Sequence, residues 1–259
     1  MKKLFILLIA IFAFSATPTL AATWKPVTPE GYTPITWAKA PGVASFFKAP
    51  NGNGSLDFLT RIYLPQNQIQ FIASDNPPVD WGMATPPTTT PAPEISNAFH
   101  NFAFSRFVAE SGKTFGKDAK FVWNGPFFNI TLPTSDLSMA IKSTASGNTL
   151  ISSGGRPDFD MAAPRQMLLI NNRTAKANIQ EFEADIFVGE ASGDQALEGF
   201  APTVGKGEAS TARLFIGVMP SKQEVVIYCS QSATIGEASR ALTTAGVPEE
   251  NQLEADGGG

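Results

Sequence analysis

Three charged residues near the end of the chain stand where strands and helices are expected to begin or end. Arg213 opens an apolar run, Glu237 falls in the first turn of an expected helix, and Asp256 is followed by Gly257–Gly259. A guanidinium can hold a phosphate through two parallel hydrogen bonds. A carboxylate can activate water or stabilise positive charge that develops on a sugar carbon. Consecutive glycines let the backbone turn sharply and expose N–H groups to an anion.

Each of these residues also has a purely structural interpretation. Glu237 could simply interact with the dipole of its own helix, because carboxylates stabilise helix N-termini. Arg213 could form an ion pair at a strand edge. Glu254 alternates with Asp256 on an expected strand, so the two would share a face, and Glu254 could substitute for either catalytic carboxylate.

A second motif lies in the middle of the chain. Asn124-Gly125-Pro126-Phe127-Phe128 directly follows an expected strand at residues 120–123. The Asn124 amide can both donate to and accept from a sugar hydroxyl or a phosphate oxygen. Gly125 can adopt a positive φ and bring the backbone close to a ligand. Pro126 fixes its own φ and removes one N–H donor.

The order Asn124, Arg213, Glu237, Asp256 along one chain resembles the phosphodiester glycosidase domain family. That family includes the uncovering enzyme, which removes N-acetylglucosamine from a mannose phosphate. The resemblance covers roughly residues 57–259 and implies an exported hydrolase that cleaves a sugar-phosphodiester bond in a cell-envelope or extracellular glycan. We expect no cofactor and assign no metal ligand, and the sequence does not determine whether a metal is required. It assigns catalysis to Asp256 and Glu237, and binding of substrate and phosphate to Arg213, Asn124, Gly125, Gly257 and Gly258.

Two departures from the family pattern bear on activity. Pro126 stands where the family usually has a second glycine. The chain stops after Gly259, where family members usually continue with Ser or Thr and a further strand. We therefore expect either a C-terminally incomplete sequence or a truncated relative of the family. The alternative function is a non-catalytic, exported glycan-binding protein on the same fold. It would need only the phosphate clamp and aromatic platforms such as Trp123 or Phe127.

The N-terminus is typical of a secretory signal peptide. Lys2 and Lys3 precede an apolar run at residues 4–14, and small residues follow. We expect cleavage after Ala21 or Ala22 and a secreted or periplasmic bacterial protein with no stable membrane span; an uncleaved anchor is the alternative. Without the two leader lysines, 17 of the 19 basic residues remain against 23 acidic ones, a net charge of −6. Such a surface argues against nucleic acid as a partner.

The single cysteine and the single histidine exclude several chemistries. Cys229 is the only cysteine, so no intramolecular disulfide can form, and its apolar neighbours favour a buried packing role over a nucleophile. His100 is the only histidine, which excludes a zinc site built on several histidines. Its phenylalanine-rich surroundings favour a structural role over a place in a Ser-His-Asp arrangement.

The elements that must position these residues are mostly strands. A proline-rich arm at 22–56 precedes a domain at 57–259, which carries a Pro/Thr-rich loop at 75–94. Strands are expected at 57–64, 68–72, 120–123, 149–152, 166–170, 179–188, 212–218 and 224–229, and helices at 96–111 and 235–244. Thr234 is the expected N-cap of the last helix and Gly246 lies just beyond its end. The pattern predicts an α+β fold with a mixed, mainly antiparallel sheet and a few packed helices.

Overall fold

The computed structural model describes about half of the chain. The described residues are 24–36, 40–49, 55–71, 98–100, 123, 128–131, 134–137, 139–143, 150–152, 164–188, 194–203 and 209–255.

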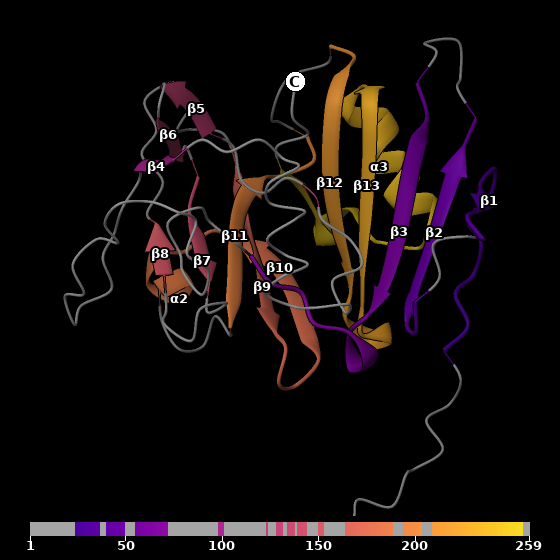
Figure 1. Cartoon of the computed structure of the whole chain (residues 1–259), viewed down its shortest axis with the longest axis horizontal. Helices are drawn as coiled ribbons and strands as arrows, with labels where there is room; N and C mark the ends of the chain where they lie inside the picture. Colours follow the sequence, from indigo (N-terminus) through magenta and orange to yellow (C-terminus); the bar gives the residue numbers. More distant parts are fainter. Residues whose placement is uncertain are drawn as a thin grey trace, which may run out of the picture.

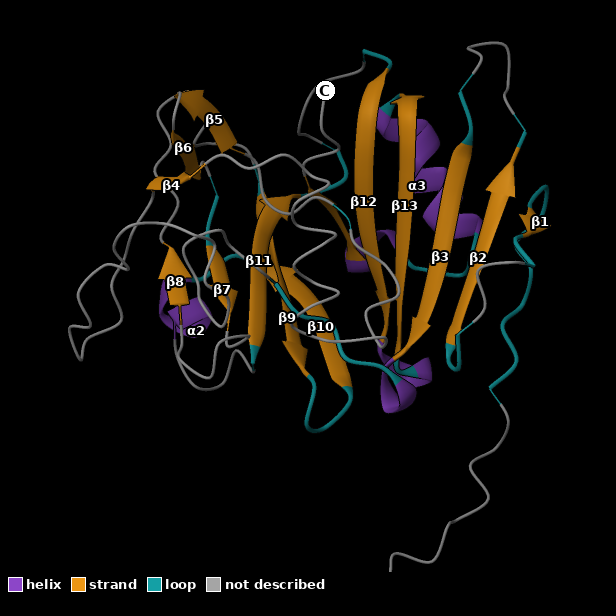
Figure 2. Cartoon of the chain, in the orientation of Figure 1, coloured by secondary structure: helices purple, strands orange, loops and turns teal. Residues whose placement is uncertain are grey.

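One large antiparallel sheet dominates the described part of the chain (Figures 1 and 2). Its strands are hydrogen-bonded in the order β1-β2-β3-β13-β12-β14-β11-β7-β8, and β9 pairs with both β11 and β10. The eleven strands are β1 (Thr33–Pro34), β2 (Val43–Lys48), β3 (Asp57–Tyr63), β7 (Ile141–Ser143), β8 (Leu150–Ser152), β9 (Arg165–Asn171), β10 (Lys176–Glu181), β11 (Gln195–Phe200), β12 (Thr211–Met219), β13 (Glu224–Ala233) and β14 (Gln252–Ala255). A separate small sheet joins β4 (Ala98–His100), β6 (Thr134–Leu137) and β5 (Phe128–Thr131).

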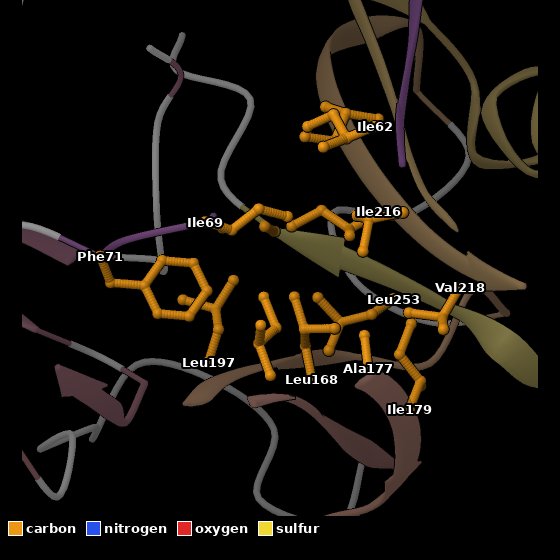
Figure 3. Packing of buried hydrophobic residues seen from close by; sticks show 14 of the residues in the cluster. Ile62, Ile69, Phe71, Leu168, Ala177, Ile179, Leu197, Ile216, Val218 and Leu253 are labelled. Carbon is orange, nitrogen blue, oxygen red and sulfur yellow. The ribbon is translucent and has the colours of Figure 1, made fainter. Parts of the chain in front are cut away.

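The large sheet is bent around a hydrophobic core. Ile216 of β12, Leu253 of β14, Leu168 of β9 and Ile179 of β10 belong to one buried cluster, and β10 contacts β12 although the two strands are not paired (Figure 3). Successive apolar residues of β12 and β13 alternate between this core and the opposite face, as the twofold period of a strand requires. The bend therefore makes one sheet supply both walls of its own core.

The opposite face of β3, β12 and β13 is covered by α3 (Ile235–Thr244). In Figure 1 this helix lies behind those strands. Its buried residues Ile235, Ala238 and Leu242 recur at helical spacing and pack against Phe215 and Tyr228. A shorter helix, α2 (Ala184–Val188), contributes Phe187 to a third cluster with β9 and β11 residues.

Both ends of α3 follow from local sequence. The Thr234 side chain accepts a hydrogen bond from the Glu237 N–H, and the Glu237 carboxylate accepts one from the Thr234 N–H, which together form a capping box. At the other end Gly246 has φ +93°, and Val247 N–H donates to the Leu242 carbonyl. This is a Schellman ending, which needs a residue that tolerates positive φ.

A buried ion pair joins the arm to the sheet. Arg61 Nη2 lies 2.6 Å from Glu224 Oε2, and Trp24 Nε1 donates to Glu224 Oε1 at 2.9 Å. Arg61 also donates to the carbonyls of Val27 and Ala245. One guanidinium therefore ties together the N-terminal arm, the sheet and the C-terminal end of α3.

The β-rich, mainly antiparallel prediction is confirmed, whereas the expectation of a few packed helices overstated the helical content. Among the described residues only α2 and α3 are α-helices, and α2 has five residues. The 235–244 helix has the predicted bounds and cap. The expected arm at 22–56 contains β1 and β2, which extend the sheet beyond β3.

Three sequence expectations are wrong in detail. Residues 68–71 form no strand, because the 3-10 turn η1 (Leu64–Gln66) redirects the chain, and Ile69 and Phe71 enter the core from an irregular segment. Residues 98–100 are β4, not the start of a helix at 96. The expected strand at 179–188 is divided between β10 and α2. The remainder of 96–111, the 75–94 loop and the 120–122 segment lie outside the described residues. No helix in the described ranges is long and apolar enough to cross a membrane.

Candidate functional site

Arg213 lies inside the protein, beneath the start of α3. Its Nη1 is 2.5 Å from Glu254 Oε1, and both side chains have 0% exposure. Nε donates to the Ala233 carbonyl at 3.1 Å and Nη2 to the Ala209 carbonyl at 2.8 Å. Arg213 therefore forms an ion pair, as its structural interpretation expected. Its partner is the buried Glu254 carboxylate on the neighbouring strand. A phosphate in solvent does not reach this guanidinium in the described state.

The pairing of Arg213 with Glu254 follows from strand register. Phe215 of β12 stands directly opposite Glu254 of β14, so Glu254 lies on the α3 side of the sheet, as does Arg213 two residues before Phe215. In the sequence, Glu254 alternates with Asp256, and nothing there pairs it with Arg213. Only the register of β12 against β14 reveals that contact.

Glu237 is exposed at the N-terminal end of α3. Its Oε2 accepts hydrogen bonds from Thr234 N at 2.8 Å and from Thr234 Oγ1 at 3.1 Å. Glu237 therefore interacts with the N-terminus of its own helix, as its structural interpretation expected. Both hydrogen bonds use Oε2, so Oε1 takes no part in the capping box.

Arg213 and Glu237 are the two predicted site residues that the structure describes, and both bind the same short segment of chain. Arg213 Nε binds the carbonyl of Ala233, and Glu237 binds the backbone of Thr234, the next residue. Arg213 approaches from the buried side and Glu237 from the exposed side. The junction between β13 and α3 thus brings together two residues that are 24 positions apart in the sequence.

A polar pocket of about 130 Å³ opens next to this junction. Five charged side chains and three hydroxyl groups line it. The charged residues are Glu30, Lys48, Asp57, Glu237 and Arg240, and the hydroxyl groups belong to Tyr32, Ser232 and Thr244.

The pocket residues come from distant parts of the chain. A turn in which Tyr32 N–H donates to the Pro29 carbonyl brings Glu30 and Tyr32 to the site. Lys48 and Asp57 are paired residues at the adjoining ends of β2 and β3. None of these four residues was predicted from the sequence to belong to a site. Of the four, only Asp57 could have been selected as a candidate from the sequence, because it begins an expected strand, as Arg213 does.

Tyr228 lies next to the pocket on the buried side. Its ring has 0% exposure and packs in the α3-side cluster. Burial, followed by the nearby Asp57 carboxylate, raises the pKa of its phenol well above the ordinary value. Ser230 and Asp57 are both close enough to influence Tyr228 Oη, yet this oxygen makes no hydrogen bond of regular geometry with any described residue. Burial also raises the pKa of Tyr32, with Asp57 again contributing.

The remaining predicted site residues lie outside the described residues: Asn124, Gly125, Asp256, Gly257 and Gly258. Their neighbours are described. Trp123 is partly buried and packs against the core inside the bent sheet. Ala255 pairs with Leu214, the residue after Arg213. Convergence of the predicted residues on one cleft therefore stays a prediction.

Cys229 packs partly buried against the core inside the bent sheet, in accord with the predicted packing role. Burial, and then the Asp57 charge, raises the pKa of its thiol to about 11. His100 pairs with Thr134 through the backbone of the small sheet. Within the described part of the chain, no three His, Cys, Asp or Glu residues are grouped to hold a metal ion.

No protein-family model matches the chain, and no curated protein matches it either.

Proposed function

We propose that the protein is an exported hydrolase that cleaves a sugar-phosphodiester bond in a cell-envelope or extracellular glycan. The observation that carries the proposal is the ordered set Asn124, Arg213, Glu237 and Asp256, with three glycines after the last carboxylate. This order resembles the phosphodiester glycosidase family. Export rests on the leader-like N-terminus.

The described contacts favour a site near the start of α3. Arg213 and Glu237 both bind the 233–234 segment. Ala255, the last described residue before Asp256, pairs with Leu214, the residue after Arg213. These relations support the proposal that Asp256 and Glu237 act on one substrate.

Each residue then has a chemical role. Cleavage at the anomeric carbon develops positive charge on the sugar, which the Asp256 carboxylate would stabilise. Glu237 would act on water or on the leaving group through Oε1, since Oε2 binds the helix terminus. Asn124 and the N–H groups of Gly257 and Gly258 would bind the phosphate. With its guanidinium buried, Arg213 fits a positioning role through Glu254 better than direct contact with phosphate.

The test is hydrolysis of a chromogenic diester of a sugar 1-phosphate by the exported protein. Asp256→Asn keeps the size of the side chain but not its charge, so kcat should fall by about two orders of magnitude or more while substrate binding changes little. Equal activity in the wild type and in Asp256→Asn would move the chemistry to another carboxylate. No hydrolysis by the wild type of any sugar-phosphodiester would refute the proposal.

The alternative is a non-catalytic glycan-binding protein. The polar pocket beside α3 favours it, because hydroxyl-rich ligands bind among charged and hydroxyl side chains without any turnover. A wild-type protein that binds the diester and never hydrolyses it would establish this alternative.

A further inference from the structure

The pocket beside α3 holds charges of both signs. Glu30, Asp57 and Glu237 contribute three carboxylates, and Lys48 and Arg240 contribute two cations. Among the described residues, none of these five forms an ion pair. Exposed ion pairs contribute little stability, so these side chains can turn to a ligand at little cost.

The pocket wall also carries hydroxyl groups. Tyr32 contributes a phenol, and Ser232 and Thr244 contribute two aliphatic hydroxyls, among the charged residues. A hydroxyl group can both donate and accept a hydrogen bond, so this lining can bind either kind of polar group on a ligand.

The volume of the pocket suits one ring. The volume of about 130 Å³ is close to the roughly 150 Å³ of an engineered cavity that accepts benzene. That cavity is apolar, whereas this pocket is lined by charged and hydroxyl groups. A six-membered ring that carries hydroxyl groups matches both properties.

We propose that this pocket binds a single uncharged sugar residue. Sugar hydroxyls both donate and accept, so one ring can donate to Asp57 and accept from Lys48 and Arg240. An anion would be repelled by three carboxylates, and a cation by two basic groups. Neither can therefore interact favourably with all the charged residues of the lining. The proposal takes a sugar as ligand from the proposed function, but it requires no hydrolysis and no contact with Asp256.

The test measures binding of D-glucose and N-acetyl-D-glucosamine by calorimetry or by NMR shifts. Glucuronate, glucosamine and inorganic phosphate serve as charged probes. At least one neutral sugar should bind with Kd on the order of 1 mM, and Asp57→Asn and Arg240→Gln should each weaken it roughly tenfold. Lys222→Gln is the matched control. Lys222 is exposed and belongs to η4 (Pro220–Lys222), between β12 and β13 at the other end of the sheet. This variant should bind as the wild type does.

Three results would overturn the proposal. The first is that neither neutral sugar binds at about 50 mM. The second is that binding is equal in the wild type and in both pocket variants. The third is that phosphate binds more tightly than either sugar and is lost in Arg240→Gln. Arg240 is exposed on α3, so Arg240→Gln should fold normally, and its melting temperature checks this.

These measurements distinguish a failure of the pocket proposal from a failure of the hydrolase proposal. Sugar binding that survives Asp256→Asn and is lost in Arg240→Gln would establish this pocket even if no diester is ever hydrolysed. Hydrolysis with no sugar bound at the pocket would leave the enzyme proposal standing and refute this one.

Discussion

Arg213 Nη1 lies 2.5 Å from Glu254 Oε1, and neither side chain has any exposed surface. The pair joins β12 to β14, while the same guanidinium binds the carbonyl of Ala233 just before α3. It therefore fixes the helix start and the last described strand against each other.

Glu254→Gln should lower the free energy of unfolding by about 3–5 kcal/mol, because it removes the carboxylate charge that lies against the buried Arg213 guanidinium. Urea denaturation of the purified protein measures this. Glu249→Gln is the control, since Glu249 is exposed on η5 (Glu249–Asn251) and should change stability by less than about 0.5 kcal/mol. If both variants lose the same stability, the buried pair does not have the structural role assigned to it.

Glu237→Gln separates helix capping from catalysis. Glutamine can close the capping box as glutamate does, so stability should stay within a few tenths of a kcal/mol of wild type. Glutamine cannot act as a carboxylate, so hydrolysis of the diester should fall by about a hundredfold if Glu237 is catalytic. Thr234→Ala is the converse variant and should cost about 1 kcal/mol of stability through loss of the N-cap. Full activity in Glu237→Gln would restrict Glu237 to the helix terminus.

Cys229 should react slowly with iodoacetamide at pH 8. With a pKa of about 11, its thiolate fraction is roughly a hundred times smaller than that of an exposed thiol, and partial burial slows access further. Mass spectrometry of the native and urea-unfolded protein compares the two rates. Native labelling as fast as unfolded labelling would contradict the packing role.

Tyr228 should make the fold sensitive to alkaline pH. Its pKa is raised in the folded state above the ordinary value of about 10, so the native state holds the proton more tightly than the unfolded state. This contribution is complete below about pH 10 and is lost as the pH rises toward the folded pKa. Between pH 9 and pH 11, Tyr228→Phe should lose about 1 kcal/mol less stability than wild type.

At pH 8 the same two proteins should be nearly equally stable, because Tyr228 Oη has no regular hydrogen bond to lose with a described residue. Urea denaturation at pH 8, 9 and 11 tests both the equal stability at pH 8 and the smaller alkaline loss of Tyr228→Phe. Parallel stability curves for wild type and Tyr228→Phe would show that another group causes the alkaline loss.

Local sequence was enough to predict α3. Thr234 and Glu237 have capping-box spacing, and Gly246 supplies the positive φ that ends the helix, so nearby residues determine both ends. The strands β3, β9, β12 and β13 were also recognisable, because runs of branched and aromatic residues between turn residues are typical of strands. Short-range patterns failed at 68–71, where core burial does not require a strand.

Only the tertiary structure decided what surrounds the candidate residues. Arg213 looks the same in sequence whether it binds phosphate or a buried carboxylate. The register of β12 against β14 places Glu254 beside it, and register depends on contacts between strands about 40 residues apart. The pocket is a similar case, because Glu30, Lys48, Asp57 and Arg240 come together only when the arm docks against β3 and α3. The sequence therefore determined the residue types available for chemistry, and long-range packing determined which of them face a ligand and which are buried as structural partners.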